Sequence, residues 1–481
     1  MTDESSLPAA PRKPLWRRIL KWTCRIVLAL ILLAVVGWGV WTCLSIRNVE
    51  RHARRIAAAG EPVTFRQLSD ALGQVKEADN AGPLYQAAMV LQKKEYPKRE
   101  VKGEDGEICL RSAFDEVEAE FTKLLRRQQP VSKELQTKVQ QVLDDNRLSL
   151  ELLDRGGRMS GCDYDLGVEH EFITVWRKMN VLRKLTKLAS LRIGLLAVRE
   201  EGDKAVESLD VALKMNRIFD RQPLLICHLV KAACFNLSTY NIPVILASGH
   251  PSRAALTKLE QSLIQAEKTI DLKRMFEAEQ VLDLKILQTL DWDVLRQTHE
   301  MLGQTVSGRD ALWSQAYLIA SAPFWFTTRD DQLDKYHECI QAVSTEWHQT
   351  LESLTALESR ERSHFDFGDV YSIKTDVELT ARAVALLRAG QIAARIEQYL
   401  MDKHSLPASL EDVQKAYGTP LPSDPFTGKS FIYQPVGKKG YRLYSVGENL
   451  KDDGGAMFEG KGDDWGLGVR TPAATSQPGA N

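Results

Sequence analysis

The chain combines one unbroken apolar run with many shorter segments in which apolar residues recur at helical spacing. The unbroken run extends from Ile26 to Leu44 and contains no charged residue. About 20 apolar residues in a helix span the roughly 30 Å hydrocarbon core of a bilayer. The pattern therefore predicts a transmembrane helix over residues 26–44, with a short tail over residues 1–25 before it.

Basic residues on both sides of this run predict its orientation. Six basic residues precede the run and four follow it: Arg12, Lys13, Arg17, Arg18, Lys21 and Arg25, then Arg47, Arg51, Arg54 and Arg55. Because an excess of Lys and Arg marks the cytoplasmic side, we expect a cytoplasmic N-terminus, with the bulk of the chain outside the cytoplasm. The protein would then be a single-pass protein of the cell inner membrane.

A cleaved signal peptide is the alternative interpretation of the run. Its apolar core would have about 7–15 residues and would end in a small-residue cleavage site. The run here is longer and ends in Trp41, Thr42, Cys43 and Leu44. Its length and its end favour an uncleaved anchor.

Residues 45–375 are predicted to form a helical domain, beginning with a basic helix that continues past the membrane. Thr64, Ser132 and Ser252 stand at positions where a side-chain oxygen can cap the start of a helix. We expect further helices over about 113–129 and 131–155, and one running from Ser252 toward residue 289. Residues 97–111 are charged and lack a period, so they are predicted to be a loop.

Two segments inside this domain have a more specific pattern. Leu188–Met215 places small and apolar residues at helical spacing on both sides of Glu201-Gly202-Asp203, which predicts an αα-hairpin. Residues 311–326 are unusually apolar, but Pro323 interrupts them and they are short for a membrane span. Three interpretations of 311–326 stay open: a buried core segment, an interfacial segment on the bilayer and a groove for a partner.

The C-terminal part changes from a helical to a strand-like pattern. A long amphipathic helix is expected over 376–403, followed by a short helix from Ala408. Aromatic segments at Phe431–Tyr433 and Tyr441–Tyr444 flank Gly437–Gly440, which predicts a β-hairpin. The predicted fold is thus mainly α, with a single transmembrane helix, a helical domain over 45–375 and a small α+β module over 376–470 that carries a short antiparallel sheet. Residues 471–481 are predicted to be a disordered tail.

Composition and motifs restrict the function. Lys and Arg number 63 and Asp and Glu 64, so the net charge is −1, which argues against nucleic acid as a partner. The seven cysteines include no CxxC pair and are interpreted as buried free thiols beyond the two that flank the span. No HExxH, GxSxG or P-loop motif occurs. We therefore predict a non-catalytic protein.

A membrane-anchored hydrolase is the alternative, with its site in the helical domain. Catalytic partners need not be close in sequence, so this alternative stays open. Its discriminating feature would be a buried cluster around His170, His228 or His364 in a pocket.

The C-terminal part carries a set of motifs in a fixed order. They are a Leu-Pro after a long helix, Asp424-Pro425-Phe426-Thr427-Gly428, an aromatic strand, Tyr441-x-Leu-Tyr-Ser-x-Gly447, Gly454-Gly455, and Asp463-Asp464-Trp465. In this order the region of about 376–468 resembles the C-terminal domain of the type II secretion major pseudopilin. The remainder resembles uncharacterised membrane-anchored helical proteins of planctomycete-type bacteria, a likeness that carries no assigned function.

The pseudopilin resemblance implies a calcium site in the loop after the Ser-x-Gly strand. The residues that match the family's ligands are Asp452, Asp453, Asp463 and Asp464, with backbone carbonyls from Leu450 or its neighbours. Calcium takes six to eight hard oxygen ligands, which such a loop can supply. The chain departs from the family pattern in its adjacent Asp463-Asp464 and in the extra residues after Gly454-Gly455. A solvated acidic loop without metal is the alternative.

The resemblance also has a limit in the position of the membrane helix. A pseudopilin has an apolar N-terminal helix continuous with its globular domain, whereas here the span lies far upstream and residues 376–403 carry Arg382, Arg388, Arg395 and Glu397. Assembly through a pilin stalk is therefore not expected. The predicted role is a membrane-anchored scaffold or interaction protein with protein partners.

Overall fold

The computed structural model describes residues 15–93, 96–102, 108–167, 172–289, 332–361, 373–455 and 464–470. The chain divides into two compact units, one formed by Met1–Val63 with Asp283–Lys335 and the other by Thr64–Leu282 with Tyr336–Asn481. The structure confirms a mainly helical fold with an apolar N-terminal helix and a small three-stranded antiparallel sheet near the C-terminus.

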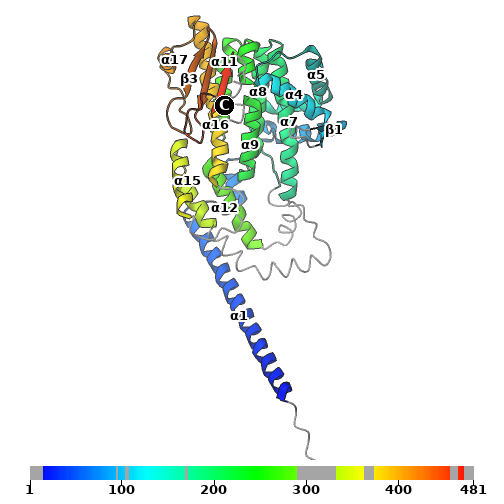
Figure 1. Cartoon of the computed structure of the whole chain (residues 1–481), viewed down its shortest axis with the longest axis vertical. Helices are drawn as coiled ribbons and strands as arrows, with labels where there is room; N and C mark the ends of the chain where they lie inside the picture. Colours follow the sequence, from blue (N-terminus) through cyan, green and yellow to red (C-terminus); the bar gives the residue numbers. More distant parts are fainter. Residues whose placement is uncertain are drawn as a thin grey trace, which may run out of the picture. The chain divides into compact units, whose positions relative to one another are not determined.

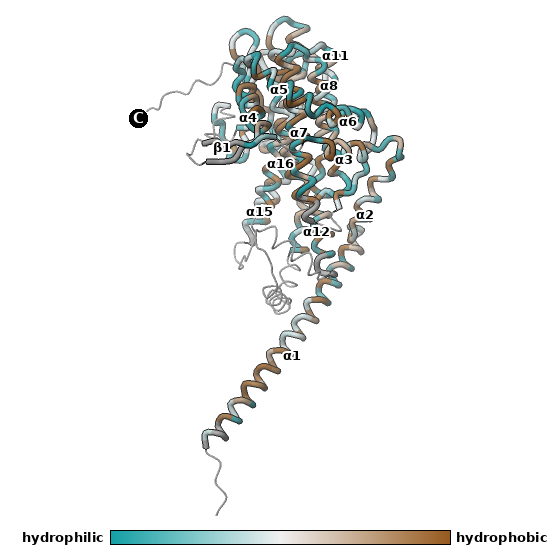
Figure 2. The backbone as a smooth tube through the Cα atoms, turned by 90° about the vertical axis from the view of Figure 1, so that its right-hand side faces the viewer, coloured by the Kyte–Doolittle hydropathy of each residue, from teal (hydrophilic) through white to brown (hydrophobic). Residues whose placement is uncertain are grey.

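The first unit is dominated by α1 (Leu15–Ala58), a single helix that includes the predicted span. The most apolar stretch of α1 has none of its residues buried, and Figure 2 shows it as the hydrophobic part of this helix. Farther along, Val49 and Ile56 pack with Leu284 and Leu333 in a small cluster. His52 Nε2 also lies 3.0 Å from Asp334 Oδ1. One part of α1 is thus a candidate membrane span, and the other packs against protein.

The second unit contains most of the helices and all the labelled strands. Its helices are α2 (Phe65–Asp70), α3 (Gly82–Leu91), α4 (Ala113–Arg126), α5 (Lys133–Asp145), α6 (Arg147–Gly157), α7 (Phe172–Val198), α8 (Gly202–Met215), α9 (Leu225–Thr239), α10 (Ile242–Val244), α11 (Arg253–Lys268), α15 (Trp347–Glu361), α16 (Ile373–Lys403) and α17 (Leu410–Tyr417). Short turns are η1 (Glu77–Asp79), η2 (Asn216–Phe219) and η3 (Ile245–Gly249), and α12 (Leu272–Thr289) crosses the division between the units.

The strands form two antiparallel groups. β1 (Lys98–Lys102) pairs with β2 (Ile108–Ser112), with Lys98 opposite Ser112. β4 (Gly440–Ser445) lies between β3 (Ile432–Val436) and β5 (Trp465–Val469), with Ile432 opposite Tyr444 and Tyr441 opposite Val469. The predicted hairpin over 431–444 is confirmed. β5 was not predicted, because its glycines weaken a strand pattern. Gly466 is needed there, since an added Cβ would lie 2.1 Å from Leu443 O.

The central helix of the second unit is α16. It packs against α9 and α11 and also against β4 and β5, and Figure 1 shows the strands beside it. Small residues permit this close packing: a Cβ added at Gly390 would lie 2.8 Å from both Ile242 Cδ1 and Leu263 Cδ1. Arg470, at the end of β5, makes a bidentate ion pair with Glu397 of α16 at 2.7 and 2.8 Å. One helix therefore serves both the helical part and the sheet.

One hydrophobic core runs across the predicted boundary at residue 376. It includes Phe65 near its start and Val469 near its end, with residues of α7, α9, α11, α16 and the sheet between them. The helical part from Thr64 and the C-terminal part belong to the same compact unit. The predicted module over 376–470 thus shares its core with the helices.

Several local predictions can be compared with the described residues. Thr64 caps α2 in a capping box, and Ser132 and Ser252 cap α5 and α11. The αα-hairpin is formed by α7 and α8, where a Cβ added at Gly202 would lie 2.3 Å from Gly249 O. Leu225–Gly249 is a second stretch of membrane-like length and composition. In its most apolar window 72% of the residues are buried, as in a core helix. Residues 311–326 and 471–481 lie outside the described residues.

Three predictions were wrong in detail. The single helix predicted from Ser252 toward residue 289 is two helices, α11 and α12, separated at residues 269–271. Residues 97–111 were predicted to be a loop, but β1 and β2 pair there through their backbones, which a side-chain pattern does not reveal. The helix predicted over 131–155 is two helices separated at Asn146. The buried Asn146 amide donates to Val142 O at 2.8 Å and accepts from Lys93 N at 2.9 Å. This side chain competes with the helical backbone bonds and ends α5.

The shared core leads to a test of the module as an independent domain. We expect residues 376–470 made alone to lack a cooperative unfolding transition, because the face of α16 that packs on α9 and α11 would be exposed to water. Thermal unfolding followed by circular dichroism measures this. Residues 64–481 are the matched control and are expected to unfold cooperatively. A sharp transition in the short fragment would contradict the shared-core interpretation.

Candidate functional site

The predicted calcium ligands lie in the loop that joins β4 to β5. Asp452, Asp453 and Asp464 are described by the structure, and Asp463 lies outside the described residues. The loop turns sharply, because Gly447, Leu450, Gly454 and Gly455 all have positive φ. Such backbone conformations suit glycine and are uncommon for leucine. The backbone path thus brings the acidic residues back toward the sheet.

Two of these carboxylates are hydrogen-bonded close to the end of β4. Asp452 Oδ1 accepts from Tyr444 Oη at 3.0 Å and from Gly454 N at 2.8 Å. Asp453 Oδ2 accepts from Asn449 Nδ2 at 2.9 Å. Burial and the bond to Asp452 raise the pKa of Tyr444, so its hydroxyl keeps its proton and acts as the donor. These bonds fix Asp452 against the sheet.

Asp464 differs from the other two because it is buried. It is 2% exposed, and its Oδ2 accepts from Gly455 N at 2.7 Å. Its Oδ1 is buried with no hydrogen-bond partner among the described residues. Burial raises the pKa of Asp464, and the charges of Asp453 and Asp452 raise it further, although backbone hydrogen bonds from Gly455 and Asp453 oppose this. The three carboxylates are therefore close enough to interact electrostatically.

This arrangement meets part of the requirement for calcium. A buried carboxylate oxygen without a donor is costly, and a hard cation would satisfy it. Within the described ranges, no group of three or more His, Cys, Asp or Glu residues is arranged to hold a metal ion. Asp464 and Asp452 are thus the described side chains of this loop that fit a cation best.

The motifs behind the pseudopilin resemblance meet each other beside this loop. Asp424 Oδ1 accepts from Phe426 N and from Ser445 Oγ, each at 2.8 Å, and Ser445 Oγ accepts from Gly447 N at 3.1 Å. Gly428 closes the Asp-Pro turn with φ +69°. The Asp-Pro-Phe-Thr-Gly and Tyr-Ser-x-Gly segments therefore support one another through a buried carboxylate and hydroxyl.

Both ends of the loop are also held by α16. Arg382 of α16 forms an ion pair with Glu448, just after β4. Its guanidinium lies 4.8 Å from the ring centroid of Trp465, at the start of β5. A cation over an indole ring is attracted by the ring's quadrupole. The helix thus fixes the two points between which the acidic loop extends.

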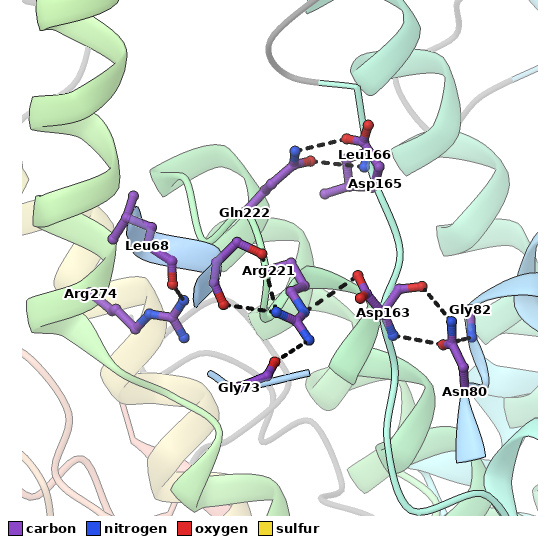
Figure 3. A network of polar contacts seen from close by, with 11 residues as sticks. Leu68, Gly73, Asn80, Gly82, Asp163, Asp165, Leu166, Arg221, Gln222 and Arg274 are labelled. Carbon is purple, nitrogen blue, oxygen red and sulfur yellow. Dashed lines mark hydrogen bonds and ion pairs between the residues drawn. The ribbon is translucent and has the colours of Figure 1, made fainter. Parts of the chain in front are cut away.

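A second polar network holds the start of the second unit (Figure 3). Arg221 donates from Nη1 to Ser69 O at 2.8 Å and from Nη2 to Gly73 O at 2.7 Å, and its Nε lies 3.4 Å from Asp163 Oδ1. Arg274 Nη2 donates to Leu68 O at 2.6 Å. Two arginines therefore bind backbone carbonyls at the end of α2.

The same network continues to α3 through Asp163. Asn80 Oδ1 accepts from Asp163 N at 2.7 Å and from Gly82 N at 2.9 Å, while Asn80 Nδ2 donates to Asp163 O (Figure 3). The N-cap of α3 is Ala81, which makes no side-chain cap bond, and the Asn80 side chain binds the amide of Gly82, the first residue of that helix. Gln222 extends the network, because its side chain donates to Asp165 Oδ1 and accepts from Leu166 N. We call this set the arginine clamp; it includes Arg221, Arg274, Asp163, Asn80 and Gln222.

Of the three histidines proposed for a hydrolase, the structure describes His228. His170 and His364 lie outside the described residues. His228 is 3% exposed, and burial lowers its pKa to about 3, with Lys231 and Arg274 adding to the effect. Its Nδ1 has no hydrogen-bond partner in the described part of the chain. A neutral imidazole beside two cations is a poor general base.

The free thiols of the described part are Cys24, Cys43, Cys162, Cys227, Cys234 and Cys339. Cys162, Cys227, Cys234 and Cys339 are buried. Burial raises the pKa of Cys162 to about 12 and that of Cys234 to about 11. Thiols with raised pKa values are unreactive, so these residues act as core side chains.

One buried carboxyl was missed by the sequence analysis. Asp376, in the first turn of α16, is 1% exposed, and neither of its carboxylate oxygens has a hydrogen-bond partner among the described residues. Burial raises its pKa to about 6. An acidic residue in the first turn of a helix is usually a surface charge that interacts favourably with the helix dipole. The sequence therefore does not show that Asp376 is buried.

Comparisons with known proteins give no relative for this chain. No family model matches it, and neither a curated protein nor a solved structure is similar to it. The function is therefore argued from the residues and their geometry.

The arginine clamp can be tested by removing Arg221. Arg221→Ala removes two hydrogen bonds from a charged donor, to Ser69 O and Gly73 O, and such a bond contributes about 1.5–3 kcal/mol. We expect the free energy of unfolding to fall by about 2–4 kcal/mol, with faster amide exchange over residues 64–74. Denaturant titration and hydrogen exchange measure the two effects. Arg155→Ala is the control, since Arg155 is exposed. Equal stability of both variants would contradict the proposed role.

Proposed function

We propose that the protein is a single-pass membrane-anchored protein with a non-catalytic scaffold or protein-interaction role. The observation that carries this proposal is the apolar stretch of α1, in whose most apolar part no side chain is buried. Leu28, Leu32 and Val36 are each more than half exposed. A continuous apolar surface of this length is stable when lipid covers it. The basic residues before it support a cytoplasmic N-terminus and an extracytoplasmic second unit.

The proposed role of the second unit rests on how its polar groups are used. Arg221 binds backbone carbonyls in the arginine clamp, and Arg470 is paired with Glu397. Cys227 and Cys234 are buried, and His228 has no acidic partner among the described residues. Chemistry-bearing side chains thus serve structure in the described part, which supports a scaffold over the alternative hydrolase.

For the C-terminal part we propose a pseudopilin-like α+β module whose acidic loop binds calcium. The support is the contact between Asp424 and Ser445, which joins the two most specific motifs, and the buried Oδ1 of Asp464. Bound calcium would neutralise the repulsion among Asp452, Asp453 and Asp464 and would hold the loop in one conformation. Such a loop would stabilise a surface for protein partners.

The anchor is tested by fractionation of cells that produce the protein. The full chain is expected to stay with membranes after alkaline carbonate extraction, whereas a variant that lacks residues 1–44 is expected in the soluble fraction. An N-terminal tag that remains on the membrane-bound protein distinguishes an anchor from a cleaved signal peptide. External protease added to spheroplasts should digest the second unit and spare the tag. Release of the full chain by carbonate would contradict the anchor, and protection of the second unit would contradict the orientation.

Calcium binding is tested by calorimetry on the purified full-length protein in a nonionic detergent. We expect saturable binding with a dissociation constant on the order of 10⁻⁴–10⁻³ M or tighter, as in extracellular calcium modules. Asp464→Asn and Asp452→Asn should weaken it at least about tenfold, because each removes an anionic oxygen ligand. Binding should also weaken as the pH falls, since protons compete for Asp464, whose pKa is raised.

Glu352→Gln is the matched control for the loss of one charge, because Glu352 is exposed on α15. It should bind calcium as the unmodified protein does. Absence of saturable heat, or unchanged binding in Asp464→Asn, would contradict the calcium proposal and leave the membrane-anchor proposal untouched.

A further inference from the structure

The second unit contains a cavity of about 570 Å³ that is separate from the acidic loop. It lies where the end of α6 meets α8, η2 and α11. Small-molecule sites in proteins commonly have volumes of about 300–1,000 Å³. The residues that line it are Arg158, Met159, Ser160, Asp210, Leu213, Lys214, Arg217, Lys258, Gln261, Ser262, Gln265, Ala266 and Thr269.

The lining carries a strong excess of positive charge. It includes four cations, Arg158, Lys214, Arg217 and Lys258, and a single anion, Asp210. These cations come from different elements, so their charges surround the cavity. In a partly enclosed space such an arrangement raises the local concentration of anions.

Both carboxylate oxygens of Asp210, the one anion of the lining, are already bound by neighbouring side chains. Asp210 is 7% exposed, its Oδ1 accepts from Ser262 Oγ at 2.9 Å, and its Oδ2 accepts from Lys214 Nζ at 2.9 Å. Lys258 Nζ lies 4.0 Å from the same Oδ2. One carboxylate thus positions two lysines whose remaining protons can bind a further anion.

Arg217 is held in place by the backbone. Its Nε donates to Lys214 O at 3.0 Å, its Nη1 to Ser160 O at 2.8 Å and its Nη2 to Met159 O at 2.9 Å. These carbonyls carry no formal charge, so the full positive charge of Arg217 remains. A guanidinium that is already fixed loses little conformational freedom when a ligand binds.

A second cavity provides an internal comparison. It has a volume of about 280 Å³ and lies among α5, α6 and α7. Its three arginines are balanced by three acids, and Arg192 is paired with Asp154 at 2.7 Å. Its charged residues are Arg147, Arg192, Arg199, Asp144, Glu151 and Asp154. The positive excess of the larger cavity is therefore not shared by this second cavity.

We propose that the larger cavity binds a small organic anion that carries phosphate. Arginine matches phosphate oxygens with its planar fork and lysine binds them as a point charge, and both kinds of donor are present. Gln261 and Gln265, both exposed on α11, supply neutral amide donors for the uncharged part of such a molecule. The ligand-sized volume favours a small molecule over an acidic protein segment.

The test uses inorganic pyrophosphate as the probe and the full-length protein in a nonionic detergent, without divalent metal. Calorimetry at low ionic strength is expected to show saturable binding that weakens as salt is added. Arg158→Gln and Lys258→Gln should each reduce the affinity about tenfold. Arg147→Gln, which removes one charge from α6 at the smaller cavity, should leave it unchanged.

Each outcome decides the proposal. Binding that is lost in Arg158→Gln and Lys258→Gln but kept in Arg147→Gln supports the site, provided that circular dichroism shows the same unfolding midpoint for all variants. If Lys258→Gln shifts this midpoint, Arg158→Gln alone decides, because Arg158 is exposed. Absence of binding at millimolar pyrophosphate, or equal loss in all three variants, would overturn it. Citrate serves as a carboxylate probe, and binding of citrate without pyrophosphate would overturn the choice of phosphate.

Discussion

The burial of α16 is the constraint on which the rest of the second unit depends. This helix packs against α9 and α11 as well as β4 and β5, so almost every apolar position along it faces protein. A helix that is apolar around most of its surface is stable only inside a core. Without α16 the sheet would lose the long helix that covers β4 and β5, and three short strands do not form a stable unit by themselves. This packing also fixes the acidic loop, because Arg382 of α16 contacts Glu448 and Trp465 at the two ends of the loop.

Arginine has the same structural task in several places. Arg221 and Arg274 bind carbonyls of α2 and the following turn, Arg217 binds those after α6, and Arg388 of α16 donates to Ser423 O at 2.8 Å. The last four carbonyls of a helix have no partner within it, and loops leave others unpaired. A long side chain with five donors can satisfy such groups from a neighbouring element. The charges of these arginines thereby contribute to the fold.

The two proposed ligand sites illustrate opposite uses of charge. In the acidic loop, burial of Asp464 beside Asp452 and Asp453 creates repulsion that a cation would relieve. In the larger cavity, Asp210 is saturated by its neighbours and leaves a surplus of positive charge around a ligand-sized space. Either ligand would add stability to the folded state in proportion to its affinity and concentration.

The sequence by itself determined the features that depend on neighbouring residues. The apolar run over 26–44, the caps at Thr64, Ser132 and Ser252, the αα-hairpin around Gly202 and the β-hairpin around Gly437–Gly440 are local patterns, and the structure contains each of them. Of the four aspartates in the predicted site, the structure describes Asp452, Asp453 and Asp464. Their order along the loop follows from the sequence.

Only the tertiary structure decided how these parts are joined. No pattern in residues 376–403 distinguishes a helix shared by two layers from the first helix of a separate module, because both have an apolar stripe. The pairing of β1 with β2 rests on backbone bonds, the break at Asn146 on a contact with Lys93, and the burial of Asp376 and Asp464 on distant elements. The positive cavity likewise combines α6, α8, η2 and α11. Interactions between residues far apart in the chain determine which side chains are buried and which charges lie close together. Burial and neighbouring charge in turn determine the chemistry of each site.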